Sequence, residues 1–234
     1  MSALAASTAL RPRDAATLIL VDRSDGRACV LLGKRHAGHA FMPSKYVFPG
    51  GALDPSDRRM SVAAPLDPRV EAKLMIETRR PSPALAQALA LAAIRETFEE
   101  TGLAVGVVAD SAATDPPEGA WTRFAATGVA PALDRLDFVA RAITPPGRSR
   151  RYDARFFVAD AASIAFRAEG VVHAGAELVE LVWTPLDEAI GLDLPQITRA
   201  VLADLAAATQ VGMDRARPRP FYRQRSGRGW RGEL

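Results

Sequence analysis

Four charged side chains lie close together in the stretch AAIRETFEETGL, residues 92–103: Arg95, Glu96, Glu99 and Glu100. On a helix, the spacing of the three glutamates places them along one face, where they repel one another. Each such pair destabilises a helix by about 0.2–0.5 kcal/mol, and the helix dipole disfavours anions near the C-terminal end. A hard divalent cation such as Mg²⁺ or Mn²⁺, bound through the carboxylate oxygens, would offset both effects. A solvated acidic face is the alternative, and the helix alone does not separate the two interpretations.

The pattern around the glutamates predicts one long helix. Residues 84–101 are rich in Ala and Leu, and Pro83 lies near the expected first turn. Gly102 suits the left-handed conformation that commonly ends a helix. Ile94 and Phe98 lie off the acidic face, so we expect them to point into a core.

Short apolar or alternating segments predict strands on both sides of this helix. Residues 17–22 and 28–35 flank a Ser-Asp-Gly turn and form the pattern of a hairpin. A short strand at residues 46–48 ends at Pro-Gly-Gly, whose glycines allow an irregular backbone. Strands together with helices predict a mixed α/β fold. The other expected elements are strands at residues 136–144, 153–160 and 178–184, helical segments at residues 70–78 and 194–209, and a loop-like segment at residues 111–131.

The positive charge of the chain is concentrated at one end. The net charge is +3, and residues 215–234 contain seven arginines and one glutamate, which leaves −3 for the rest. Phe221, Tyr222 and Trp230 alternate with these arginines. A nucleic-acid arm, a solvated tail and a segment that folds back to dock its aromatic rings are the three interpretations. The acidic remainder makes nucleic acid an unlikely partner.

Composition also bears on the compartment. The sequence has no apolar run near the ~20 residues that span a bilayer, so no membrane association is expected. The N-terminus lacks a basic start followed by an apolar core, so no secretory signal is expected. The single cysteine, Cys29, excludes an internal disulfide and fits a reducing compartment. These features predict a cytoplasmic protein.

The order of the charged residues and glycines resembles the Nudix hydrolase signature, G-x5-E-x7-R-E-hydrophobic-x-E-E-x-G-hydrophobic. Here it reads as Gly51, followed much later by RETFEETGL at residues 95–103. The chain departs from the signature in that Asp57 stands in place of the first Glu. It also has 37 residues (58 to 94) between Asp57 and Arg95 where seven are usual, and Thr97 replaces an apolar residue.

Residues 30–57, VLLGKRHAGHAFMPSKYVFPGGALDPSD, are similar to a subgroup of Nudix proteins whose signature is split by an insertion. That subgroup includes the peroxisomal coenzyme A diphosphatase of animals. The resemblance implies the Nudix fold, a mixed β-sheet sandwiched between helices (α/β/α), with a partly helical insertion at about residues 58–83. It implies a Nudix domain at residues 14–211, an N-terminal tail at 1–13 and an Arg-rich C-terminal tail at 212–234.

The resemblance also implies a reaction, the metal-dependent hydrolysis of a nucleoside diphosphate linked to another moiety. Coenzyme A or an acyl derivative is the first expectation for the substrate, with nucleotide sugars, NADH and ADP-ribose as alternatives. A non-catalytic nucleotide-binding module is the competing class, and a homodimer is one arrangement that the sequence allows. In this scheme Glu96, Glu99 and Glu100 hold Mg²⁺ or Mn²⁺, Arg95 orients a carboxylate, and Asp57 is a supporting acid.

Further residues complete the implied site. Gly50 and Gly51 let their loop pass close to the metal-binding helix, and the Gly51 carbonyl is a candidate ligand. Arg35 is expected to contact phosphates. Glu177, at the edge of a loop, is the preferred general base. Residues that fit similar roles, each with an ordinary structural explanation as well, are Glu180 and His173 for the base and His36 and Lys45 for phosphate contact.

Overall fold

The computed structural model describes residues 10–38, 42–109, 115–210, 214–225 and 227–234. The strands are β1 (Arg13–Asp22), β2 (Cys29–Arg35), β3 (Tyr46–Val47), β4 (Gly50–Ala52), β5 (Leu103–Val105), β6 (Val107–Val108), β7 (Val129–Ala130), β8 (Asp137–Ile143), β9 (Tyr152–Asp160), β10 (Ile164–Arg167), β11 (Leu178–Pro185), β12 (Pro220–Arg225) and β13 (Arg228–Glu233). The α-helices are α1 (Pro68–Met75), α2 (Pro83–Thr101), α3 (Ala120–Ala125), α4 (Leu186–Ala189) and α5 (Gln196–Gln210), with short 3-10 turns at Pro55–Arg58, Leu133–Arg135 and Ala161–Ser163.

A large mixed sheet forms the centre of the molecule. Its strands follow the order β11-β2-β1-β9-β8-β12-β13, with β3 paired to β2 and β4 to β1. The central pair, β1 and β9, is parallel, while β1 pairs antiparallel with β2 as the predicted hairpin. The mixed α/β fold predicted from the sequence is therefore confirmed.

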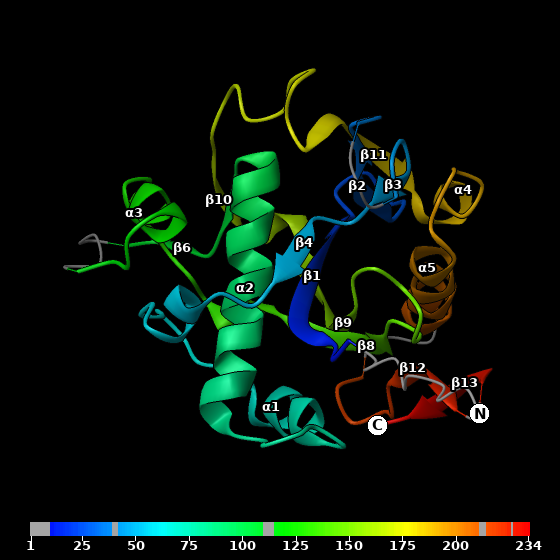
Figure 1. The fold of residues 1–234 in the computed structure, drawn as a ribbon. Coiled ribbons are helices and arrows are strands. Elements are labelled where there is room, and N and C mark those ends of the chain that lie inside the picture. The colour runs from blue at the N-terminus through cyan, green and yellow to red at the C-terminus, as the bar shows by residue number, and fades with distance from the viewer. Residues whose placement is uncertain (1–9, 39–41, 110–114, 211–213, 226) are drawn as a thin grey trace, which may run out of the picture.

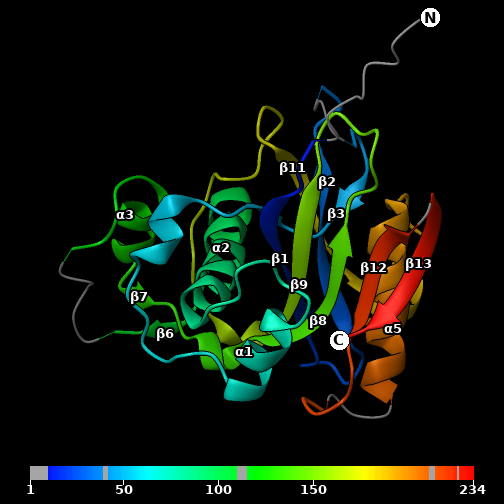
Figure 2. The same cartoon turned by 60° about the horizontal axis from the view of Figure 1, so that its bottom comes forward.

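Helices cover both faces of this sheet, α2 on one side and α5 on the other (Figures 1 and 2). Successive residues of β1 alternate between the two cores, since side chains of a strand point to opposite faces. Leu18 and Leu20 pack in the core that contains α2, whereas Ile19 and Val21 pack in the core that contains α5. The layers are thus those of an α/β/α sandwich.

Helix α2 begins and ends as the sequence predicts. The Ser82 hydroxyl accepts a hydrogen bond from the Leu85 amide at 3.1 Å, and Pro83 occupies the first turn. Gly102 ends the helix with φ of 76°, in the left-handed region. A Cβ on Gly102 would lie 2.5 Å from the Ala168 carbonyl oxygen, so the following chain passes too close for a larger residue.

The insertion predicted at residues 58–83 is partly helical and packs on the same core as α2. Helix α1 begins at Pro68, and the Asp67 side chain caps it by accepting from the Arg69 amide at 2.8 Å. Val70 and Leu74 lie one turn apart on its buried face. Residues 58–83 therefore add to the hydrophobic core.

The segment at residues 111–131 differs from the sequence expectation. It was expected to be a loop, but it contains α3 and β7. Residues 110–114 lie outside the described part of the chain. Trp121 and Phe124, three residues apart, are fully buried, so tertiary packing forms a helix that its prolines and glycines obscure.

The Arg-rich segment folds back and extends the sheet, which is the docked arrangement among the three interpretations. β12 pairs parallel with β8, and β13 pairs antiparallel with β12. Phe221 is fully buried. At the other end, residues 1–9 lie outside the described part, and Arg13 already belongs to β1. None of the described helices is long and apolar enough to cross a membrane.

Candidate active site

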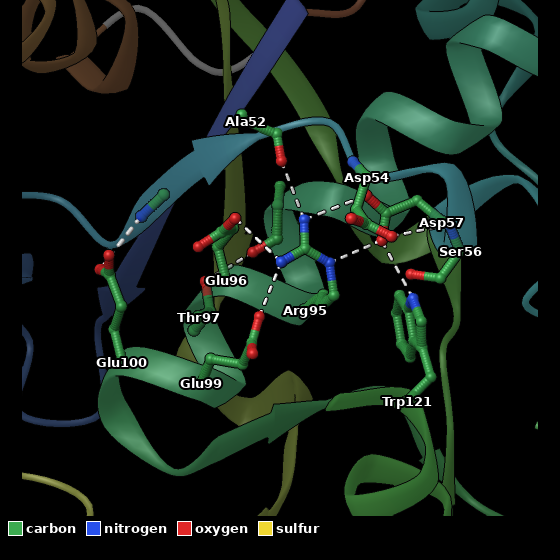
Figure 3. A network of polar contacts seen from close by, with 12 residues as sticks. Ala52, Asp54, Ser56, Asp57, Arg95, Glu96, Thr97, Glu99, Glu100 and Trp121 are labelled. Carbon is green, nitrogen blue, oxygen red and sulfur yellow. Dashed lines mark hydrogen bonds and ion pairs between the residues drawn. The ribbon is translucent and has the colours of Figure 1, made fainter. Parts of the chain in front are cut away.

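Arg95 lies at the centre of the polar network near the end of α2 (Figure 3). Its Nε and Nη2 donate to the two carboxylate oxygens of Asp57 at 2.7 and 3.1 Å. Its Nη1 donates to Glu96 at 2.9 Å and to Glu99 at 2.6 Å, and Nη2 also reaches the Ala52 carbonyl oxygen at 2.9 Å. The carboxylate pairing expected of Arg95 is therefore present, in bidentate form to Asp57, which gives it a fixed orientation.

Asp57 is fully buried, and its two oxygens accept from several donors. Besides Arg95, the indole Nε1 of Trp121 donates to Asp57 at 3.0 Å and the Asp54 amide donates at 2.8 Å. The 3-10 turn Pro55–Arg58, capped by Asp54, brings this short side chain to Arg95. Trp121 was missed by sequence reasoning. Its only signal was an aromatic residue in an otherwise loop-like segment.

The glycine pair lies against the glutamates. A Cβ on Gly51 would lie 2.5 Å from the carboxylate of Glu96, so a side chain at this position would displace that carboxylate. The Gly50 amide donates to Glu100 at 3.3 Å. A Cβ on Gly50 would meet the Ala16 carbonyl oxygen of β1 at 2.6 Å. Both glycines are therefore needed for close approach, as the sequence suggests.

The charge of the glutamates is unfavourable in this site. Burial raises the pKa of Glu100 well above its usual range, and the neighbouring charges of Glu177 and Glu96 raise it further. Burial also raises the pKa of Glu96, against the opposing effect of Arg95. Glu100, which is buried, and Glu96, which is half-buried, both resist ionisation and gain most from a nearby positive charge.

The three glutamates supply the hard oxygen donors that Mg²⁺ and Mn²⁺ prefer, so the residues present fit such an ion. Their carboxylates do not converge in the structure. Glu96 and Glu99 turn to Arg95, while Glu100 turns to the Gly50 amide (Figure 3). Within the described residues, no three His, Cys, Asp or Glu side chains are grouped as a metal site.

Arg35 and Glu177 lie together near Glu100. The Arg35 guanidinium is 3.2 Å from the Glu177 carboxylate, and the His36 amide donates to the Glu177 carbonyl at 3.0 Å. The charges of Arg35 and Glu177 both act on Glu100, in opposite directions. The end of β2 and the residue before β11 therefore bring the predicted phosphate-binding and base residues to one side of the glutamates.

The other candidates have partners elsewhere. Glu180 accepts from the Tyr46 hydroxyl at 3.2 Å, and Lys45 pairs with Asp193. The Nδ1 atoms of His36 and His173 each accept from a backbone amide two residues further on. None of these contacts is with the network around Arg95.

Comparison with solved structures agrees with the fold. A Nudix hydrolase from Alicyclobacillus acidocaldarius matches with a TM-score of 0.62 and 28% identity, over 84% of this chain and 92% of that one. RenU, a Nudix hydrolase from M. smegmatis, matches with a TM-score of 0.45 and 19% identity, over 85% and 86%. The Nudix domain of Shewanella oneidensis NrtR, solved with ADP-ribose, matches with a TM-score of 0.46 and 13% identity, over 86% and 90%. Of these three, the structure from Alicyclobacillus acidocaldarius has the highest TM-score and the highest identity to this chain.

No protein-family model and no curated protein sequence matches the chain significantly. The α/β/α sandwich, the glycine pair and the arginine-held glutamates nevertheless occur together on a chain similar to a solved Nudix hydrolase. The chain therefore has the Nudix fold, and it is similar to a solved Nudix hydrolase over most of its length.

Proposed function

We propose that the protein is a metal-dependent pyrophosphohydrolase that cleaves the phosphoanhydride of a nucleoside diphosphate linked to another moiety. One observation carries the proposal. Three glutamates lie on the last two turns of α2, and two of them are held by Arg95, which is itself fixed by the buried Asp57. A helix whose role was only structural would not gather carboxylates at its C-terminal end.

Glu96, Glu99 and Glu100 are the residues that would hold Mg²⁺ or Mn²⁺. Such an ion neutralises diphosphate oxygens and lowers the pKa of a bound water. Arg95 then positions Glu96 and Glu99 and limits the rotation of their side chains. Gly51 leaves the space that the Glu96 carboxylate occupies.

Glu177 is the residue we assign as general base. Its side chain is partly exposed, its charge acts on the buried Glu100, and it is paired with Arg35. A carboxylate on a loop beside the glutamates is placed to take a proton from an attacking water. Arg35, on the same side, offers a guanidinium to the phosphates of the substrate.

Coenzyme A or an acyl derivative is our first candidate substrate, on the sequence resemblance of residues 30–57 to the subgroup with a split signature. ADP-ribose, NADH and nucleotide sugars are the alternatives. The test is to incubate the protein with each compound in Mg²⁺ and in Mn²⁺ and to measure release of nucleoside monophosphate. Activity that requires the metal and is lost in Glu99→Gln supports the proposal, whereas no release from any compound contradicts it.

A nucleotide-binding module without activity is the second candidate. It predicts that nucleotides bind to the parent protein and to Glu99→Gln with equal affinity and without turnover. The complete set of Glu96, Glu99 and Glu100 together with Arg95 favours the enzyme, because binding alone does not require three metal-ligating glutamates.

A further inference from the structure

A hollow of about 490 Å³ opens beside Glu99, between the end of α2, the end of α3 and the strand β10. Its size is within the roughly 300–1,000 Å³ range of small-molecule sites. Glu99 is shared between the wall of the hollow and the network around Arg95. The hollow therefore borders the proposed reaction centre at Glu99.

The walls of the hollow are mostly apolar. Phe98 comes from α2, Ala126 from the end of α3, and Phe166 from β10; Ala168 and Val171 follow β10 in the chain. Phe166 is 41% exposed, although large aromatic side chains are usually buried. A ligand in the hollow would remove this ring from water, which is favourable.

The neutral polar group of the lining is already engaged. The Thr127 hydroxyl donates to the Phe124 carbonyl at 2.6 Å and accepts from the Val129 amide at 3.3 Å. A nucleobase placed against the apolar part of the lining, away from Glu99 and Arg123, would lose its hydrogen bonds to water without replacing them, which is costly. An aliphatic group loses no hydrogen bonds on entering. The lining therefore favours a hydrocarbon over a base.

A single cation lies among the residues that line this hollow. Arg123 of α3 is 67% exposed along its side chain, and its Nη2 is 3.5 Å from the Glu99 carboxylate. An exposed guanidinium beside the glutamates can turn toward a phosphate that approaches them. The lining thus combines the charged Arg123, next to Glu99, with an apolar interior.

We propose that this hollow is the subsite for an aliphatic arm carried by the substrate on the phosphate distal to the nucleoside. The inference rests on the proposed function and adds the substrate class, a nucleoside diphosphate esterified with an extended apolar group. Arg35 and Glu177 lie beside Glu100, whereas the hollow lies beside Glu99. The diphosphate would lie across the three glutamates, with the nucleoside toward Arg35 and the arm in the hollow.

The reaction on such a substrate is simple hydrolysis. Water adds to one phosphorus of the anhydride, one P–O bond forms, and the bridging P–O bond breaks. The products are a nucleoside monophosphate and the phosphate ester of the arm, and the proton released from water passes to the base. No oxidant, reductant or second substrate is required.

The test uses the β-alkyl esters of ADP with methyl, butyl and octyl chains. Each methylene that enters the hollow is expected to raise kcat/KM up to about fourfold, because burying a CH₂ changes affinity by about that factor. Ala126→Trp narrows the hollow, so this variant should lower kcat/KM for the octyl ester at least about tenfold more than for the methyl ester. The matched control is Ala207→Trp, on the exposed surface of α5 on the opposite side of the sheet, which should leave the whole series unchanged.

Equal kcat/KM across the three esters would overturn the subsite while leaving the proposed function intact. So would an Ala126→Trp variant that keeps the full dependence on chain length. If no ester is hydrolysed, release of nucleoside monophosphate from the compounds named under the proposed function decides that function, and equilibrium binding of the esters tests the hollow by itself. Octyl ester that binds no tighter than methyl ester would overturn the inference. Should Ala126→Trp not fold, Phe166→Ser removes an exposed apolar wall and should lower the preference for the octyl ester.

Discussion

Arg95 joins residues that are distant in the sequence, since it contacts Asp57 and Ala52 before the insertion and the glutamates after it. Its charge is balanced by a fully buried carboxylate. Breaking a buried ion pair leaves one charge without a partner, which is far more costly than losing an exposed pair. The orientation of Glu96 and Glu99, two of the proposed metal ligands, therefore depends on the ion pair between Arg95 and Asp57.

Asp57→Asn is predicted to lower the free energy of unfolding by about 1.5–3 kcal/mol, because Arg95 loses a charged hydrogen-bond partner while it keeps Glu96 and Glu99. Urea denaturation followed by circular dichroism measures the effect. A loss below 1 kcal/mol would show that the ion pair contributes little to stability.

Trp121→Phe keeps an aromatic ring beside Phe124, 5.3 Å away between ring centres, and removes the indole N–H that reaches Asp57. We expect a loss of about 1–3 kcal/mol, because a buried acceptor loses one donor. The same substitution in an Asp57→Asn background should cost less, since the pair is then already changed. Equal costs in both backgrounds would mean that the indole acts by packing alone.

Thr97 supplies a residue-scale control, because it occupies a position that is apolar in the signature. It is fully buried, and its hydroxyl donates to the Ala93 carbonyl of its own helix at 2.8 Å. Thr97→Val is expected to change stability by no more than about 1 kcal/mol and to leave turnover unchanged. A large loss of activity in this variant would indicate a role for the hydroxyl that its contacts do not show.

Glu99→Gln is predicted to reduce turnover by at least about 100-fold, more than the loss of a group outside the metal shell. A second readout is independent of activity. Mn²⁺ should raise the unfolding temperature of the parent protein, since a ligand that binds the native state stabilises it, and should do so much less in the variant. The same metal-induced rise in both proteins would remove Glu99 from the ligand set.

At the level of elements, the site forms where the backbone of β4 passes close to the glutamates of α2. The glycines at residues 50 and 51 place backbone against the glutamates, and the 3-10 turn that follows delivers Asp57. Helix α3 contributes Trp121 to the network and Arg123 to the hollow. The site is therefore formed by four elements, namely β4, the 3-10 turn Pro55–Arg58, α2 and α3.

Gly51→Ala is predicted to reduce activity more than stability. The added methyl would lie 2.5 Å from the Glu96 carboxylate and would push this side chain away, with little effect on the core. Steady-state kinetics and thermal unfolding measure the two effects. Gly229→Ala, a substitution into open space on β13, is the matched control and should change neither. A Gly51→Ala enzyme with normal kinetics would show that Glu96 need not stay where it is.

Across the whole molecule, the C-terminal residues 215–234 connect residues 58–83 to the sheet through ion pairs and hydrogen bonds. Arg215 pairs with Asp67 at 3.0 Å, and Lys73 of α1 donates to the Arg217 carbonyl at 2.7 Å. Arg223 pairs with Glu77, and its guanidinium lies over the rings of both Phe221 and Trp230. The arginine-aromatic pattern is thus explained by packing within the chain, and deletion of residues 215–234 should unfold the edge of the sheet.

Arg223→Ala is predicted to lower the free energy of unfolding by about 1–2 kcal/mol, from the loss of two cation–π contacts and an ion pair. Arg228→Ala, at an exposed position of the same hairpin, is the matched control and should stay within about 0.5 kcal/mol. Chemical denaturation of both variants measures the difference. Equal stability of the two would mean that the stacking of Arg223 contributes nothing.

The local elements could be predicted because their signals are local. The cap at Ser82, the proline after it and the terminal Gly102 define α2 from neighbouring residues alone. The hairpin of β1 and β2 follows from alternation and a turn. The helix α3 and the final hairpin were missed or left open, because long-range burial of Trp121 and Phe221 stabilises them.

By itself, the sequence determined which chemical groups are available and that three carboxylates share one helical face, since periodicity and residue type are properties of adjacent positions. Only the tertiary structure decided that Asp57 reaches Arg95 across the insertion, that Trp121 donates to Asp57, and that a hollow opens beside Glu99. The two hydrogen-bonded contacts join residues far apart in the chain, with 38 positions between Asp57 and Arg95 and 64 between Asp57 and Trp121. Their geometry depends on how whole elements pack, which no local pattern encodes.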